Sequence, residues 1–193
     1  MEHTALSEFR LTRPEQMVLL ELARASIRHG VQKRRALTVT VEKLSAELSV
    51  PRASFVTLQK RGCLRGCIGS LEAWRPLAVD VAENAFAAAF RDPRFPPVRG
   101  DEVDDLEIHL SLLTPATAMD FSSEADLLGQ LQPGVDGLIL QEGPHRGTFL
   151  PSVWAELSTA KIFLSHLKRK AGLSADYWSP TVRIWRYQAE MIE

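Results

Sequence analysis

Two short stretches of the chain share one pattern, and this pattern limits the available folds more than any other feature. The runs Val56–Gln59 and Arg65–Ile68, joined by a turn, resemble the runs Leu138–Gln141 and Arg146–Phe149, which are also joined by a turn. Each pair reads as a β-hairpin, and each hairpin is followed by a helix and a further strand. The repetition predicts a hairpin–helix–strand unit over about 54–115 and again over about 136–190, with all strands in one sheet. Chance similarity between the two stretches is the alternative.

The helices are expected before and between these hairpins. Thr12 and Glu15 have the spacing of a capping box, and Gly30 is the expected end of the helix that they begin. A shorter helix over Val41–Leu48 completes an N-terminal helical segment, 12–50, and Pro76–Phe90 reads as a long buried helix because apolar residues occupy most of its surface.

The remaining elements complete one compact domain over 1–193. A short helix is expected after Ser123, another helix over 160–171, and a last strand over Val182–Ala189. The clearest strand pattern is Leu106–Leu112, where apolar and polar residues alternate. Antiparallel hairpins with helices segregated between them predict an α+β fold rather than a doubly wound parallel sheet.

Composition excludes several classes of function. The 193 residues are 45% hydrophobic, and 23 Lys and Arg nearly balance 24 Asp and Glu, so nucleic-acid binding through a large excess of charge is not expected. No stretch has the length and apolarity of a signal peptide or a membrane span, and we therefore expect a cytoplasmic protein without a membrane partner. Two cysteines, Cys63 and Cys67, are too few for a disulfide framework.

The segment Leu64–Gly69 carries the strongest sign of chemistry. Strand alternation would place Leu64 and Ile68 in the core and Arg65 on the face of Cys67, about 6.6 Å along the strand, where its field would favour a thiolate. Gly66 and Gly69 indicate a bulge or a close approach by a ligand or another backbone. The alternative is that the glycines make room for a helix and that Cys67 is a small buried side chain.

Histidines and a charged loop offer further candidates. His109 and His166 lie off the apolar faces of their elements, so either would meet Cys67 in space or lie at the surface as an ordinary histidine. The histidine and cysteine spacing does not match a zinc site, and no metal site is predicted.

The proline-rich segment 91–98 brings charged residues together with Phe95. Arg91, Asp92 and Arg94 would form ordinary surface ion pairs, or they would lie on a rigid loop at the rim of a pocket.

Six ordered motifs resemble the AMMECR domain family, also called protein A of the AmmeMemoRadiSam system. They are LRGCIG (64–69), PLAVDVAENAFAAAFRDPRFPP (76–97), LSLLTP (110–115), PGVDGLIL (133–140), TFLPSVW (148–154) and FLSHLKRKAGL (163–173). The resemblance covers about residues 6–190 and implies a single AMMECR-type domain, with two repeats in one barrel-like sheet flanked by helices.

The resemblance also implies where a site would lie. The hallmark cysteine corresponds to Cys67, and Asn84, Arg91, Asp92, Arg94, Phe95 and His166 fall in other family motifs. The predicted ligand-binding set surrounds a catalytic candidate, Cys67, and consists of Arg65, Gly66, Gly69, Asn84, Arg91, Asp92, Phe95 and His166. Lys168 stands where many relatives have a cysteine, which argues against a second thiol partner from that segment.

Two functions are compatible with these residues. The first is a small-ligand-binding or catalytic module with a pocket centred on Cys67, in a pathway that the family context links to a Memo-like protein and a radical-SAM protein. The second is a non-catalytic protein-interaction adaptor that uses the same surface. RNA binding on a sheet face by Arg65, Arg146 and Trp185 is a distant third. No cofactor can be assigned, since glycine-rich phosphate and dinucleotide motifs are missing from the sequence.

Overall fold

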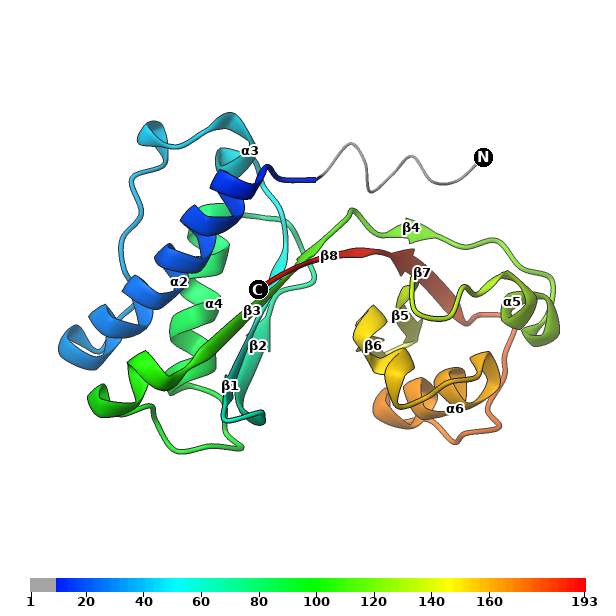
Figure 1. Ribbon diagram of the computed structural model, residues 1–193. Coiled ribbons are helices and arrows are strands. Elements are labelled where there is room, and N and C mark those ends of the chain that lie inside the picture. The colour runs from blue at the N-terminus through cyan, green and yellow to red at the C-terminus, as the bar shows by residue number, and fades with distance from the viewer. Residues whose placement is uncertain (1–9) are drawn as a thin grey trace. The chain divides into compact units, whose positions relative to one another are not determined.

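The computed structural model describes residues 10–193 as an α+β protein made of two compact units (Figure 1). The first unit extends to Thr114 and includes Glu190–Glu193, and the second is Pro115–Ala189. Within the described residues, no helix combines the length and the apolarity needed to cross a bilayer.

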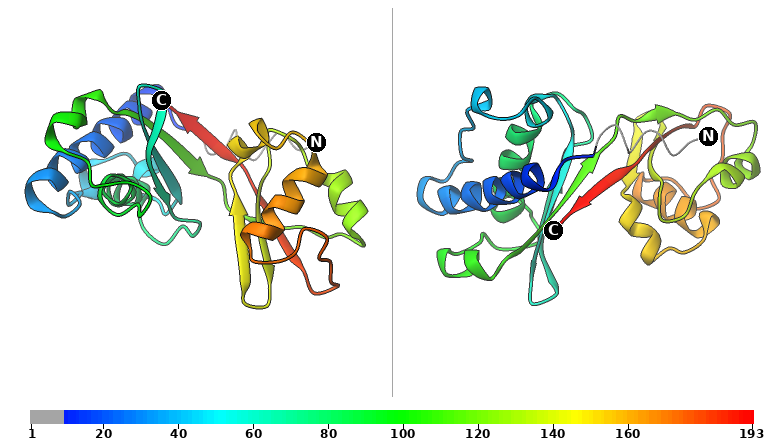
Figure 2. Two further views of the ribbon diagram at one scale, coloured as in Figure 1. Left: turned by 90° about the horizontal axis from the view of Figure 1, so that it is seen from below. Right: turned by 45° about the horizontal axis from the view of Figure 1, so that its top comes forward.

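The first unit contains a four-stranded sheet with the order β2-β1-β3-β8. Its elements are α2 (Arg13–Lys33), the short helices η1 (Val41–Lys43) and α3 (Ala46–Ser49), β1 (Ser54–Lys60), β2 (Cys63–Gly69), α4 (Leu77–Phe90), η2 (Gly100–Asp105), β3 (Glu107–Leu113) and β8 (Ala189–Ile192). Figure 2 shows α2 and α4 on the same side of this sheet. The core of the unit joins Leu19 and Ile27 of α2, Val81 and Ala85 of α4, and Val56 of β1, all of which are fully buried.

The first helix begins as predicted but ends later. The Glu15 carboxylate accepts hydrogen bonds from the N–H and the hydroxyl of Thr12, at 2.9 and 2.7 Å, which secures the helix start. The prediction that Gly30 ends the helix was wrong, because the rings of Phe86 and Phe90 occupy the place of a side chain at Gly30. The glycine permits close packing of α2 on α4, and the helix continues to Lys33.

The second unit contains a four-stranded sheet with the order β4-β7-β5-β6. Its elements are β4 (Thr117–Ala118), α5 (Glu124–Gln130), β5 (Gly137–Glu142), β6 (His145–Phe149), η3 (Pro151–Ala155), α6 (Ala160–Lys170) and β7 (Arg183–Tyr187). The rings of Trp154 and Phe163 stack in its core with centroids 3.9 Å apart, beside Leu138 and Leu140 of β5.

The prediction of one barrel-like sheet was wrong, since the strands of residues 10–193 form two separate sheets and no closed barrel. The expected last strand is divided: β7 pairs with β5 in the second sheet, and β8 belongs to the first sheet. Each helix following a hairpin buries the apolar face of its own sheet, so each unit closes its own core. Both units contain a hairpin, a helix and a third strand beside the first hairpin strand, in the orders β2-β1-β3 and β6-β5-β7. An origin by duplication stays a prediction.

Candidate functional site

The hairpin β1–β2 positions the motif that contains Cys67. Arg61 and Gly62 form its turn with φ angles of 53° and 74°, the left-handed conformation that a two-residue hairpin turn requires. Gly66 faces α4, where a Cβ atom would collide with the carbonyl oxygen of Ala88. The glycine is therefore needed for the close approach of this strand to the helix.

A β-bulge changes the direction of the Arg65 side chain. Gly66 pairs with Leu58 and Leu64 pairs with Gln59, so Arg65 is the additional residue on β2. The prediction that Leu64 belongs to the core and that Arg65 shares a face with Cys67 was wrong, because the bulge reverses the alternation before Gly66. Leu64 is 44% exposed.

Arg65 instead fastens the proline-rich loop to the strand. Its guanidinium donates to the carbonyl oxygen of Pro96 at 2.9 Å and forms an ion pair with Glu102 at 3.1 Å. Hydrogen bonds from Arg65, from the backbone of Arg99 and from Lys60 lower the pKa of Glu102 to about 2. The positive charge of Arg65 is thus largely neutralised by this carboxylate.

Asp92 and Arg94 hold the backbone of Cys67 at the outer edge of the sheet. The Cys67 N–H donates to Asp92 Oδ2 at 2.9 Å, and Arg94 Nη2 donates to the Cys67 carbonyl at 3.3 Å. Asp92 is buried, and the Arg94 guanidinium together with the backbone N–H groups of Cys67 and Arg94 holds the pKa of its carboxyl far below the usual value. These contacts give hydrogen-bond partners to the N–H and the carbonyl of Cys67, which would otherwise be unpaired at the outer edge of the edge strand β2.

Cys67 lies in a row of polar side chains that crosses the sheet. Thr57 of β1 pairs with Cys67 of β2 on one side and with His109 of β3 on the other. Residues directly opposite one another on neighbouring strands point to the same face, and Val56 and Leu58 occupy the face that α4 covers. The three polar side chains therefore share the opposite face.

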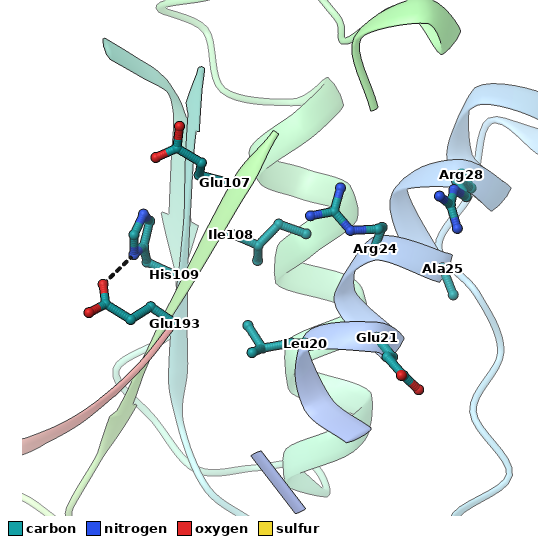
Figure 3. Close-up of a pocket in the computed structure, with 9 residues that line it drawn as sticks. All are labelled: Leu20, Glu21, Arg24, Ala25, Arg28, Glu107, Ile108, His109 and Glu193. Atoms are coloured by element: carbon teal, nitrogen blue, oxygen red, sulfur yellow. Dashed lines mark hydrogen bonds and ion pairs between the residues drawn. The ribbon is translucent and has the colours of Figure 1, made fainter. Parts of the chain in front are cut away.

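Contacts at both ends of this row are well defined. The Cys67 sulfur is 3.3 Å from Thr57 Oγ1, and Cys67 is half-buried rather than sealed in the core. His109 Nδ1 is 3.1 Å from Glu193 Oε2 (Figure 3). His109 Nε2 is buried and has no hydrogen-bond partner within residues 10–193. A neutral imidazole that shares its Nδ1 proton with a carboxylate keeps a lone pair on Nε2, which is the form of a proton acceptor.

A half-open hollow of about 710 Å³ lies beside His109, between β3 and α2 (Figure 3). Leu20, Ala25 and Ile108 supply apolar lining, and Arg24 is fixed in its wall by hydrogen bonds to the carbonyl oxygens of Val103 and Leu106 at 2.7 and 2.8 Å. Cys67 is not among the residues that line it. The hollow and the thiol therefore lie at different parts of the first unit.

Asn84 belongs to a buried polar network. Its side-chain amide donates to Asp80 Oδ2 at 2.8 Å and to the Ser54 carbonyl at 3.0 Å, and Arg75 donates to Asp80 at 2.7 Å. Asn84 is 4% exposed. In this structure the residue joins α4 to the start of β1.

The other predicted site residues are distributed around the molecule. Gly69 lies under the Phe55 ring, which occupies the place of a side chain there. Arg91 is exposed, with its guanidinium 5.0 Å from the centre of the Phe86 ring, and Phe95 is half-buried beside Arg94. His166 is exposed on α6 and belongs to the second unit, whereas Cys67 belongs to the first. Within residues 10–193, no three His, Cys, Asp or Glu side chains are grouped to hold a metal ion.

Sequence reasoning missed the role of Thr57 and the pairing of His109 with Glu193. The alternation of buried and half-buried residues along Ser54–Lys60 identifies Thr57 as a residue of the open face. Only the strand register shows that it stands between Cys67 and His109.

Comparison with known proteins defines the class to which this fold and motif belong. The AMMECR1 family matches residues 20–192, and the chain belongs to this family. A protein of Methanothermobacter thermautotrophicus is 39% identical over 183 residues, which cover 94% of this chain and 95% of the relative. Protein MJ0810 of Methanocaldococcus jannaschii is 35% identical over 187 residues, covering 95% of this chain and 92% of the relative. The crystal structure of the uncharacterized protein PH0010 from Pyrococcus horikoshii is similar with a TM-score of 0.87 and 30% identity, and the match covers 94% of this chain and 92% of that one.

Proposed function

We propose that the first unit is a small-ligand-binding or catalytic module centred on the thiol of Cys67. The observation that carries this proposal is the row formed by Cys67, Thr57 and His109, with Glu193 beyond the imidazole. A thiol next to a hydroxyl, in line with an imidazole that is oriented by a carboxylate, has the components of an activated nucleophile.

Each side chain has a separate role in this proposal. Cys67 contacts the ligand and attacks an electrophilic carbon when the ligand offers one. Thr57 Oγ1, 3.3 Å from the Cys67 sulfur, holds the thiol in place, and His109 is the base of the row that takes up the thiol proton. The sulfur electron pair forms the new S–C bond while a carbon–heteroatom π bond of the ligand opens, and the heteroatom accepts the proton from His109. Arg94 donates to the Cys67 carbonyl at 3.3 Å, but its guanidinium is paired with Asp92 as that of Arg65 is with Glu102, so neither arginine is assigned the activation of the thiol.

The two cysteines of β2 allow an internal test. Alkylation by iodoacetamide at pH 7 is measured separately for Cys63 and Cys67 by mass spectrometry of the native protein. Cys63 is exposed and Cys67 is half-buried, so accessibility alone favours Cys63. The proposal predicts that Cys67 reacts at least about tenfold faster, because a base in the row favours formation of the thiolate. Faster reaction of Cys63 contradicts an activated Cys67.

The alternative function is a protein-interaction adaptor that uses the same surface. The rigid attachment of the segment 91–97 to β2 through Asp92 and Arg65 supports such a surface. A Memo-like or radical-SAM protein is the proposed partner in either case. Charge reversal of Arg91 is the appropriate test, because Arg91 is exposed, whereas Arg65 holds the loop in place. The adaptor function predicts that Arg91→Glu loses the partner in a pull-down and that Cys67→Ser retains it; retention by Arg91→Glu argues against the adaptor.

A further inference from the structure

The hollow between α2 and β3 has the size and the lining of a small-molecule site. Its volume of about 710 Å³ falls within the range of about 300–1,000 Å³ that is usual for such sites. Leu20, Ala25 and Ile108 supply apolar lining, and Figure 3 shows Leu20 and Ile108 pointing into the hollow from opposite walls. An apolar lining of this kind favours an organic ligand over a simple ion.

Ionisable side chains of both signs line the same hollow. They are Glu21, Arg24, Arg28, Glu107, His109 and Glu193. Three of them have an ion-pair partner, because His109 pairs with Glu193 at 3.1 Å and Arg28 pairs with Asp104 at 2.6 Å. Within residues 10–193, the other three, Glu21, Arg24 and Glu107, form no ion pair. The hollow therefore offers one cation and two carboxylates to a ligand.

Arg24 is held in one orientation by neutral groups. Its two Nη atoms donate to the carbonyl oxygens of Val103 and Leu106, so three of its five N–H groups have no protein partner within residues 10–193. Its field reaches Asp104, but that carboxylate is 80% exposed and is already paired with Arg28. Because Arg24 is half-buried, a carboxylate bound to it would be partly shielded from water, which strengthens a charge-assisted hydrogen bond.

Glu21 lies one turn before Arg24 on the same face of α2. Side chains three residues apart on a helix are neighbours, with Cβ atoms about 5–6 Å apart. Glu21 is exposed, whereas its neighbour is directed toward η2 by the two carbonyl contacts. An ammonium group and a carboxylate carried by one carbon atom match this spacing. Glu107 adds a second carboxylate on the β3 wall, which disfavours a ligand that is only anionic.

We propose that this hollow binds an α-amino acid with an apolar side chain. Arg24 binds its carboxylate, Glu21 binds its ammonium group, and its side chain packs on Leu20 and Ile108. This site is independent of the thiol chemistry proposed above, because Cys67 does not line the hollow.

Titration of the full chain with L-leucine, followed by ¹H–¹⁵N NMR, tests this site. Leucine is expected to shift the amides of Leu20–Arg28 in α2 and of Glu107–His109 in β3. Isocaproate is leucine without the ammonium group, isopentylamine is leucine without the carboxylate, and glycine lacks the apolar side chain. Each of the three is expected to bind at least about tenfold more weakly than leucine, because each lacks one recognised group. This series uses the wild type alone, so it does not depend on the folding of a variant.

Substitutions of the two charged residues provide a second test. Glu21→Gln and Arg24→Gln are each expected to weaken leucine binding about tenfold, as for loss of a charge-assisted hydrogen bond. Glu42→Gln is the matched control, because Glu42 is an exposed carboxylate of the same unit that does not line the hollow, and it is expected to bind leucine as the wild type does.

Three results would overturn the proposal. The first is that millimolar leucine leaves the amides of α2 and β3 unshifted. The second is that isocaproate or isopentylamine binds as tightly as leucine, which would assign the hollow to an anion or to an amine instead. The third is that Glu42→Gln weakens binding as much as Glu21→Gln does.

Discussion

Replacing Asp92 by Asn tests whether this carboxylate holds the Cys67 strand in place. Asp92 Oδ2 accepts from the Cys67 N–H at 2.9 Å and from Arg94 Nη2 at 2.7 Å, while Oδ1 accepts from the Arg94 Nε at 2.9 Å. An amide in this position keeps one acceptor oxygen but loses the charge and the second acceptor. The Arg94 side chain is 55% exposed, so solvent screens its part of the interaction. Weakening the buried contact to Cys67 costs about 1 kcal/mol, and loss of the Arg94 contacts adds about 1 kcal/mol, giving about 2 kcal/mol in total.

The same substitution has a defined pH dependence. The folded-state pKa of Asp92 is lowered mainly by the Arg94 guanidinium, so its stabilising effect is complete above the unfolded-state pKa of about 3.9 and is lost as the pH falls toward the folded value. The stability difference between wild type and Asp92→Asn should be constant from pH 7 to about pH 4.5 and should shrink below about pH 4.

Urea unfolding at several pH values measures this difference, with Asp104→Asn as the control. Asp104 also forms an ion pair, with Arg28, but its side chain is 80% exposed. The control should change the free energy of unfolding by less than about 0.5 kcal/mol. Equal effects of the two substitutions, or an Asp92 effect that persists undiminished at low pH, would refute the reasoning.

Two further substitutions test the packing of the first unit by urea unfolding. Gly66→Ala should destabilise the protein by about 1–3 kcal/mol, because the added methyl group meets the backbone of Ala88. Gly129→Ala in α5 is the control and should be neutral or stabilising, because there is open space around its Cβ. An unchanged free energy of unfolding in Gly66→Ala contradicts the close approach of β2 to α4. Arg52 and Glu190 form an ion pair in which the side chains are only 7% and 6% exposed. Arg52→Leu should cost about 3 kcal/mol, because the buried Glu190 carboxylate then keeps only its hydrogen bonds from the Leu11 N–H and Gln16; a loss below about 1 kcal/mol contradicts a stabilising role of this buried ion pair.

Local sequence patterns were sufficient for most elements. The alternation over Leu106–Leu112, the turn between Gln59 and Arg65 and the long apolar helix predicted over Pro76–Phe90 all correspond to observed elements. Helix ends were less predictable where tertiary contacts decide them. Glycine often ends a helix, but at Gly30 the rings of Phe86 and Phe90 fill the space that a side chain would occupy, and the helix continues.

The arrangement of strands was not accessible from local patterns. The division of Val182–Ala189 between two sheets depends on which core each segment can cover, and this is a long-range property. The same limit applies to the site. The glycines indicated a bulge, but its position at Arg65 depends on the pairing register with β1, and so does the placement of Thr57 between Cys67 and His109.

The alkylation rate of Cys67 in variants of the row tests the proposed thiol chemistry most directly. His109→Gln and Thr57→Val should each slow iodoacetamide modification of Cys67 at pH 7 by at least about tenfold, in line with loss of a general base, while Cys63 should react as in the wild type. Ser111→Ala is the control, because Ser111 lies on the same strand as His109 and contacts Met191 rather than the row. Unchanged Cys67 rates in both row variants, with folded proteins, would show that the imidazole and the hydroxyl do not act on the thiol.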